Sequence, residues 1–230
     1  MRVNLIRESP SHMDEGRFTH GLANRMYVRY PLPMAKAEQK SGRGEDLKAE
    51  VLKTTLTLFS QQGYFNTSLQ DIRKATGVSI GAIYHHFESK EALAKSLYET
   101  LLDEMNQAIS EAIAPHGNCR AQSRAVVEAL FHLTLDEPQK MQFILMAQHR
   151  EYLPDASPIC SSRPFQAMKG VVEQGIRKKE IRPLDSWVAA SAMFGGALRL
   201  MNLHLDGALD RPLMDLLEET VDCAWRGLEA

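Results

Sequence analysis

The chain contains 230 residues, 44% of them hydrophobic and 24% charged, which is the composition of a globular protein with one large or two small domains. Its formal net charge of −2 excludes a uniformly polybasic nucleic-acid coat but permits a local basic surface that binds DNA. The cysteines Cys119, Cys160 and Cys223 lack metal-ligand spacing, and no apolar run approaches the roughly 18 residues that cross a bilayer. We therefore expect no metal site, no membrane partner and a reduced, cytoplasmic location.

Residues 1–44 differ in composition from the rest of the chain. They combine prolines and glycines with scattered charge and show no sustained helical period, so we predict a mostly disordered tail. Met34 would be a natural start of the protein, and one hypothesis is that the residues before it reflect a misplaced start codon. Lys36, Lys40 and Arg43 lie just before the first predicted helix, where they form either an arm that reaches DNA or a solvated basic tail.

The next segment, residues 45–92, is predicted to hold three short helices. The first covers 46–63, because apolar residues recur there at helical spacing and a glycine follows. A Thr or Ser at 67–68 caps the second helix, and a Gln or Asp at 70–71 completes a capping box.

Turn and cap residues define the remaining boundaries of this segment. Gly77 permits the left-handed backbone that redirects the chain between the second and third helices. Ser79 caps the third helix, which runs to Phe87, and Ser89 caps a long fourth helix that ends near Ile113. Three short helices with a tight turn between the last two are typical of a helix-turn-helix DNA-binding unit.

The rest of the chain is predicted to be helical as well. Proline- and glycine-containing breaks separate the apolar periods, and no segment shows the alternation of a strand. The fold class is therefore all-α, with helices expected at about 120–136, 138–152, 164–179, 185–205 and 212–228.

The helix-turn-helix segment resembles the TetR family of bacterial transcriptional regulators over about residues 47–95. The resemblance implies an N-terminal DNA-binding domain at 45–92 and a ligand-binding and dimerisation domain at 93–230. The matching positions are Leu58, Phe59, Gly63, Tyr64, Thr67, Ser68, Leu69, Ile72, Thr76, Gly77, Val78, Ser79, Gly81, Tyr84, His85, His86, Phe87, Lys90 and Leu93.

The resemblance also implies roles for individual residues on the DNA side. Gln70 would reach a base edge from the second helix. The groove-facing surface of the third helix would consist of Ser79, Ile80, Gly81, Ala82, Tyr84 and His85. Phosphate oxygens would be contacted by Thr67, Tyr84, His86 and Lys90.

The chemistry of these side chains suggests what they read. Ile80 and Ala82 favour thymine methyl groups, and Gln70 suits adenine. The third helix carries no Arg or Lys, so bidentate guanine readout would have to come from another part of the chain. Neighbouring helical residues point about 100° apart, which argues against one metal ion held by His85 and His86.

Several of these side chains also have a purely structural interpretation. Tyr84 is either a core aromatic or a hydroxyl at the edge of the groove, and we favour the groove. Lys90 is either an ordinary exposed lysine or a phosphate contact at the first turn of the fourth helix, where the helix dipole also favours an anion.

Methionine- and phenylalanine-rich helices in the second half suit an adaptable apolar pocket for a small-molecule effector. The alternative is that these side chains form plain helix-bundle core, and that the polar ones form salt bridges or face solvent. The candidate ligand contacts are Phe143, Met146, His149, Arg150, Phe165, Met168, Phe194 and Arg199.

The last two helices are predicted to form a homodimer interface. Small residues between Ala189 and Ala197 permit close helix approach, and Trp187 and Trp225 supply large apolar anchors. A two-fold dimer would present two recognition helices about 34–36 Å apart to successive major grooves, which predicts a palindromic operator.

These observations predict a ligand-responsive transcriptional repressor that a small molecule releases from double-stranded operator DNA. The alternatives are a ligand-independent or activating regulator, and a helical interaction protein that no longer reads DNA. The sequence shows no phosphate loop, HExxH or GxSxG motif, so we expect neither an enzyme nor a bound cofactor.

Overall fold

The computed structural model describes residues 42–146, 149–155 and 158–230. Within these ranges the chain forms nine α-helices and three short 3-10 helices, and the single β-bridge, between Ile181 and Glu229, belongs to no strand. The all-α prediction is confirmed. The expectations for Met34, Lys36, Lys40 and the tail up to residue 41 lie outside the described residues. None of the helices in the described part is long and apolar enough to cross a membrane.

The three N-terminal helices are α1 (Gly42–Gln62), α2 (Leu69–Thr76) and α3 (Ile80–His86). The helix α1 begins four residues before the expected start at Asp46. The capping box of α2 pairs Ser68 with Asp71, which selects one of the two predicted combinations.

Gly77 and two serine caps set the geometry of the turn and the helix that follow. Gly77 takes the left-handed conformation, with φ 72°, that the turn requires. Ser79 and Ser89 accept hydrogen bonds from the third backbone N–H after them and so begin α3 and α4 (Lys90–Ile113) as predicted.

The C-terminal part contains five more α-helices and three 3-10 helices. The α-helices are α5 (Cys119–Asp136), α6 (Pro138–Met146), α7 (Arg163–Arg177), α8 (Ser186–Leu205) and α9 (Leu217–Arg226). The 3-10 helices are η1 (His149–Glu151), η2 (Ile159–Ser161) and η3 (Leu213–Leu216).

Two predicted helices are shorter than expected. The helix predicted at 138–152 ends at Met146 and is followed by η1, where the His149 ring bonds to the Phe143 carbonyl in the last turn of α6. The helix predicted at 212–228 begins instead with η3 and becomes α-helical only at Leu217.

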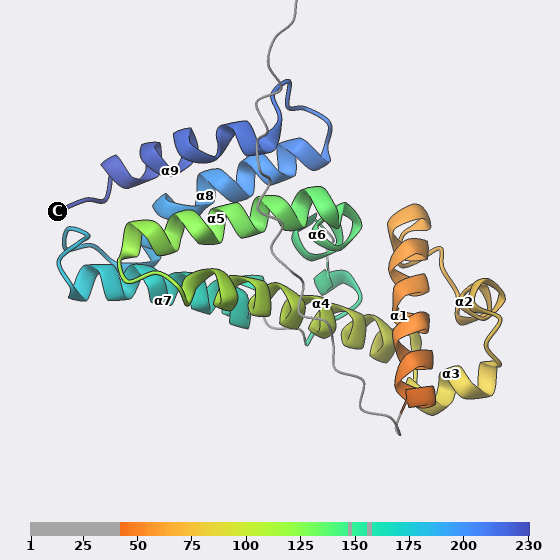
Figure 1. Ribbon diagram of the computed structural model, residues 1–230. Helices are drawn as coiled ribbons and strands as arrows, with labels where there is room; N and C mark the ends of the chain where they lie inside the picture. The colour runs from red at the N-terminus through yellow and green to blue at the C-terminus, as the bar shows by residue number, and fades with distance from the viewer. Residues whose placement is uncertain (1–41, 147–148, 156–157) are drawn as a thin grey trace, which may run out of the picture. The chain divides into compact units, whose positions relative to one another are not determined.

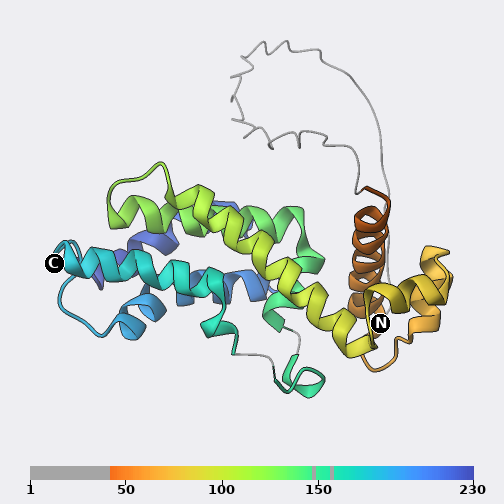
Figure 2. The same ribbon diagram turned by 90° about the horizontal axis from the view of Figure 1, so that it is seen from below.

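The helices α1, α2 and α3 gather beside the N-terminal end of α4, and the C-terminus lies near the other end of the helical domain (Figures 1 and 2). The helix α4 packs against α5 and α7, and α8 packs against α7 and α9. One continuous apolar core joins the described helices, from Val51 in α1 to Leu228 after α9. The unit formed by α1, α2 and α3 and the helical domain therefore share buried surface.

A close contact between α5 and α7 depends on a glycine. A Cβ added at Gly175 would lie 2.6 Å from Cys119 Sγ and 3.0 Å from Ile181 Cδ1. The Cys119 backbone N–H, at the start of α5, donates to Glu180 Oε2 at 2.6 Å. The turn after α7 thereby supplies the acceptor that the first turn of α5 needs.

Candidate DNA-binding interface

The helix α3, which is predicted to read DNA, packs on an apolar base. Ile72 in α2 and Ile83 in α3 are fully buried, and Phe87, which ends α3, is almost so. Val78 packs against the same core from the turn between the helices. Because these contacts fix α2 and α3 relative to each other, the opposite face of α3 is presented as a preorganised surface.

The predicted groove-facing residues occupy that surface. Ser79, Gly81 and His85 are exposed, and Tyr84 is 53% exposed. Tyr84 is therefore not a core aromatic, whereas Phe87 is.

The remaining residues of this set are less exposed. Ile80, Ala82 and His86 are half-buried, and Ile80 packs partly against the core. A Cβ at Gly81 would meet no atom of the chain within 4 Å, so packing within the protein does not demand a glycine there.

Gln70 extends the exposed surface from α2. Its Oε1 accepts a hydrogen bond of 2.8 Å from Arg73 Nε, one helical turn away. An arginine can only donate, so this bond fixes which end of the Gln70 amide is the oxygen. Arg73 is thus a second polar group of α2, next to Gln70, that the sequence did not indicate.

Thr67 is not available for the phosphate contact expected of it. The side chain is 1% exposed, and its hydroxyl donates to the Gly63 carbonyl at 2.9 Å. This buried position contradicts the prediction: Thr67 closes the turn between α1 and α2 and does not face solvent.

Lys90 is also engaged within the protein. Its ammonium donates to the main-chain oxygens of Tyr64 and Thr67, each at 3.1 Å, and lies 4.1 Å from the centroid of the Tyr64 ring. Two of its three N–H donors are therefore committed to the turn before α2, and one remains for a phosphate. Lys90 is therefore not an ordinary exposed lysine, and its contact with a phosphate stays a prediction.

Two of the candidate ligand contacts belong to a cluster between α1 and α6 that we call the aromatic joint. It consists of Phe59, Tyr64, Tyr98, Phe143, His149 and Tyr152. Phe143 stacks on Phe59 with ring centroids 6.2 Å apart, and His149 lies 4.1 Å from the Tyr98 ring. Phe143 and His149 therefore pack at the contact between α6, α4 and the unit formed by α1, α2 and α3.

Burial sets the protonation of this cluster. Desolvation lowers the pKa of His149 below its ordinary range, against the opposing effect of the Phe143 and Ile144 carbonyls. Burial also raises the pKa of Tyr64, and its hydrogen bond of 2.8 Å to Glu91 raises that pKa further. His149 is therefore neutral and both groups are uncharged near neutral pH.

The other candidate ligand contacts are dispersed. Met168 and Phe194 are buried in the helical core, as the core interpretation predicted, and Phe165 is half-buried against it. Arg150 and Arg199 are exposed. The side chain of Met146 lies outside the described part. Of the described members of this set, Arg199 alone lines the surface hollow between α8 and the η3–α9 segment.

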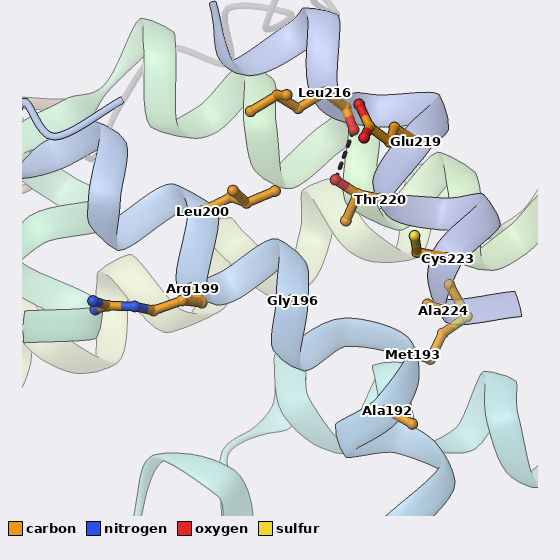
Figure 3. A pocket seen from close by; sticks show the side chains of 10 residues that line it. All are labelled: Ala192, Met193, Gly196, Arg199, Leu200, Leu216, Glu219, Thr220, Cys223 and Ala224. Carbon is orange, nitrogen blue, oxygen red and sulfur yellow. Dashed lines mark hydrogen bonds between the residues drawn. The ribbon is translucent and has the colours of Figure 1, made fainter. Parts of the chain in front are cut away.

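A surface hollow of about 520 Å³ lies between α8 and the η3–α9 segment. Figure 3 shows side chains of the two segments facing each other across it, whereas the Arg199 side chain runs away from α9. The lining is mainly apolar or small and consists of Ala192, Met193, Gly196, Arg199, Leu200, Leu216, Glu219, Thr220, Cys223 and Ala224. In the described residues, no three His, Cys, Asp or Glu side chains converge as metal ligands would.

Two family models match the chain. The model described as "Bacterial regulatory proteins, tetR family" matches residues 51–97, and the model described as "Tetracyclin repressor-like, C-terminal domain" matches residues 98–230. The boundary between them falls within α4.

Curated relatives are similar over part of their length. The transcriptional repressor KstR2 of Rhodococcus jostii is 35% identical over 100 residues, which is 44% of this chain and 45% of the relative. The regulator YhgD of Bacillus subtilis is 29% identical over 154 residues, 64% of this chain and 78% of the relative. The chain thus spans less than half of the first relative and more than three quarters of the second.

Solved structures share the fold. A TetR-family regulator from Marinobacter aquaeolei superposes with a TM-score of 0.69 at 21% identity, over 81% of this chain and 97% of that one. The regulator FadR from Bacillus subtilis, in complex with stearoyl-CoA, superposes with a TM-score of 0.68 at 18% identity, over 78% and 98%.

Proposed function

Because the chain belongs to the TetR family of bacterial regulatory proteins, we propose that it is a homodimeric repressor that binds operator DNA and is released by a small molecule. The observation that carries the DNA-binding part is the exposed face of α3. Ser79, Gly81, Tyr84 and His85 lie there on a buried base that fixes their position. A preorganised helix with exposed small and hydrogen-bonding residues fits the major groove, which is about 12 Å wide.

The contacts within the proposed interface follow from side-chain chemistry. In the proposed interface, the hydroxyl of Tyr84 and the ring of His86 donate to phosphates, and so does the remaining N–H of Lys90. Gly81 leaves room for the DNA backbone or a base edge to approach the helix closely. Gln70, held by Arg73, would read an adenine from α2.

Release by an effector is the second part of the proposal. The fold is shared with FadR, which is described in complex with stearoyl-CoA, so a helical domain of this shape can accommodate a small-molecule ligand. A ligand that binds only one of two dimer geometries lowers DNA affinity by linkage. The buried Met168 and Phe194 and the half-buried Phe165 are the candidate pocket residues that this proposal retains.

The third part of the proposal is a homodimer that forms through α8 and α9. Trp187 and Val188 on α8 are 46% and 58% exposed, which is high for large apolar side chains. A Cβ added at Gly195 or Gly196 would meet nothing within 4 Å. Together with the hollow beside α9, this open face suits the close approach of the same helices from a second copy.

The experiment that tests the proposal is selection of bound duplexes from a randomised DNA pool by the full chain, followed by titration of the selected duplex. Tyr84→Ala removes an exposed side chain from α3. Leu135→Ala removes a side chain that is 39% exposed at the end of α5 and serves as the matched control. The proposal predicts a two-fold symmetric selected sequence, weakened binding by Tyr84→Ala and unchanged binding by Leu135→Ala. A folded protein that enriches no sequence would overturn it.

A further inference from the structure

We propose that Tyr152 is a positioning residue for DNA reading: its ring stacks on Tyr64 and fixes the orientation of α2 and α3 relative to the helical domain. In a dimer this contact would set the distance and rotation between the two recognition helices. The inference rests on the proposed function, because it concerns how the same DNA-binding surface is held.

The contact between the two tyrosines is close and well aligned. Their ring centroids are 4.0 Å apart and the ring planes differ by 12°. Both side chains are buried, at 8% exposure each. Tyr64 begins the turn between α1 and α2, whereas Tyr152 directly follows η1 in the helical domain. The stack therefore joins the unit formed by α1, α2 and α3 to the helical domain, although the two residues lie far apart in the sequence.

Hydrogen bonds of the Tyr64 main chain connect this residue to the start of α2. The Tyr64 main-chain oxygen accepts hydrogen bonds from the Thr67 N–H at 3.2 Å and from Lys90 Nζ at 3.1 Å. Ser68, the next residue, is the cap of α2. A displacement of Tyr64 would thus shift the turn that determines where α2 begins and, through the buried Ile72, where α3 lies.

Tyr152 is itself held by the end of α6. The His149 Nε2 lies 2.7 Å from the Phe143 carbonyl, which can only accept, so this nitrogen carries the proton. The neutral ring then has an acceptor at Nδ1, and the Tyr152 hydroxyl donates to it at 2.8 Å. The position of the Tyr152 ring therefore follows the position of α6.

The unit formed by α1, α2 and α3 needs a second attachment to the helical domain, besides its connection through α4, if its orientation is to be fixed. The chain passes from α3 into α4, and a unit attached through one helix can still rotate about that contact. The packing of α1 against α6, reinforced by the Tyr64–Tyr152 stack, removes that freedom. Half-sites on DNA lie about one helical turn apart, so each inserted base pair rotates one half-site by about 34–36°. Rotation of the unit is therefore measurable as tolerance to altered half-site spacing.

The test uses the full chain and the duplex selected by the wild-type protein, with the half-sites moved apart or together by one or two base pairs. Tyr152→Ala removes the ring, and Tyr152→Phe keeps the stack but removes the hydrogen bond to His149. Val172→Ala, which removes two buried methyl groups on α7, controls for a general loss of stability.

The readout is the ratio of the affinity for the native spacing to the affinity for an altered spacing. A general loss of protein stability lowers these two affinities equally and leaves the ratio unchanged. We expect at least about tenfold discrimination for wild type and Val172→Ala, and a loss of most of it for Tyr152→Ala. Tyr152→Phe should retain most of the discrimination, because its buried ring still stacks on Tyr64, and should lose only the part that depends on the hydrogen bond to His149. Weaker binding by Tyr152→Ala with an unchanged ratio would overturn the inference alone. A wild-type protein that selects no duplex would instead refute the proposed function.

Discussion

Lys90 Nζ donates to the main-chain oxygen of Tyr64 at 3.1 Å, so a side chain at the start of α4 closes the turn that precedes α2. A second bond, to the Thr67 oxygen, has the same length. The lysine thus connects the DNA-binding unit to α4 through backbone groups that would otherwise need another donor.

Substitution of Lys90 is therefore expected to affect folding as well as DNA binding. Lys90→Met removes both charge-assisted bonds while keeping the aliphatic stem, and should lower the free energy of unfolding by about 1–3 kcal/mol. Urea denaturation of the variant and of wild type measures this change. Weakened DNA binding with unaltered stability would show that the lysine acts on phosphates alone.

The close contact at Gly175 predicts a coupled pair of substitutions. Gly175→Ala places a methyl group within 2.6 Å of Cys119 Sγ and should destabilise the protein by about 1–3 kcal/mol. Cys119→Ala removes the sulfur, so the double variant should recover part of that loss. A double-mutant cycle by thermal or urea unfolding gives the interaction energy, and strict additivity would contradict the packing argument.

The buried His149 predicts that stability depends on pH. Its pKa is lowered in the folded protein, so the unfolded chain binds the proton more readily; the stabilising contribution is complete above the ordinary histidine pKa of about 6.5 and is lost as pH falls below it. Between about pH 6.5 and 5 the unfolding free energy should fall by at most about 1.4 kcal/mol per pH unit from this group. His149→Gln should show a smaller slope in the same window. Equal slopes in the two proteins would rule out this assignment.

A charged side chain on the open face of α8 should prevent dimerisation. Gly195→Glu adds a carboxylate where a Cβ meets nothing in the single chain, so the monomer should fold normally while like charges meet across the two-fold axis. Light scattering after gel filtration should give a monomer for the variant and a dimer for wild type. A variant that remains dimeric would place the interface on another surface.

Base reading from α2 can be tested separately from binding. Gln70→Ala should remove the preference for adenine at one position of each half-site, at a cost of about 1–3 kcal/mol of discrimination. Arg73→Ala frees the amide that Arg73 now holds and should broaden the preference at that same position. Selection from a pool randomised at single positions measures both effects, and identical preferences for all three proteins would exclude Gln70 from base contact.

Local sequence signals predicted much of the fold. The serines Ser68, Ser79 and Ser89 cap their helices, and Gly77 adopts its left-handed turn, because caps and turns depend on residues within one helical turn of them. The apolar base of α3 followed from helical spacing for the same reason.

Several side-chain contacts within the protein could not be predicted from helical spacing. Thr67 and Lys90 belong to the family's DNA-contact pattern, yet their side chains bond to main-chain oxygens within the protein, for Lys90 across more than twenty residues. His149 was expected in a ligand pocket, but its two ring nitrogens bind Phe143 and Tyr152 and end α6. Helical spacing does not distinguish an aromatic contact between domains from the lining of a pocket, because both are apolar stripes.

The measurement that tests the central claim most directly is a fluorescence anisotropy titration of the selected duplex and of a scrambled one with wild type and Tyr84→Ala, at about 50 and 200 mM salt. The account predicts that wild type binds the selected duplex far more tightly, that affinity falls steeply with salt, and that Tyr84→Ala loses most of the preference. Equal affinity of folded wild-type protein for both duplexes would contradict the assignment of α3 as a recognition helix.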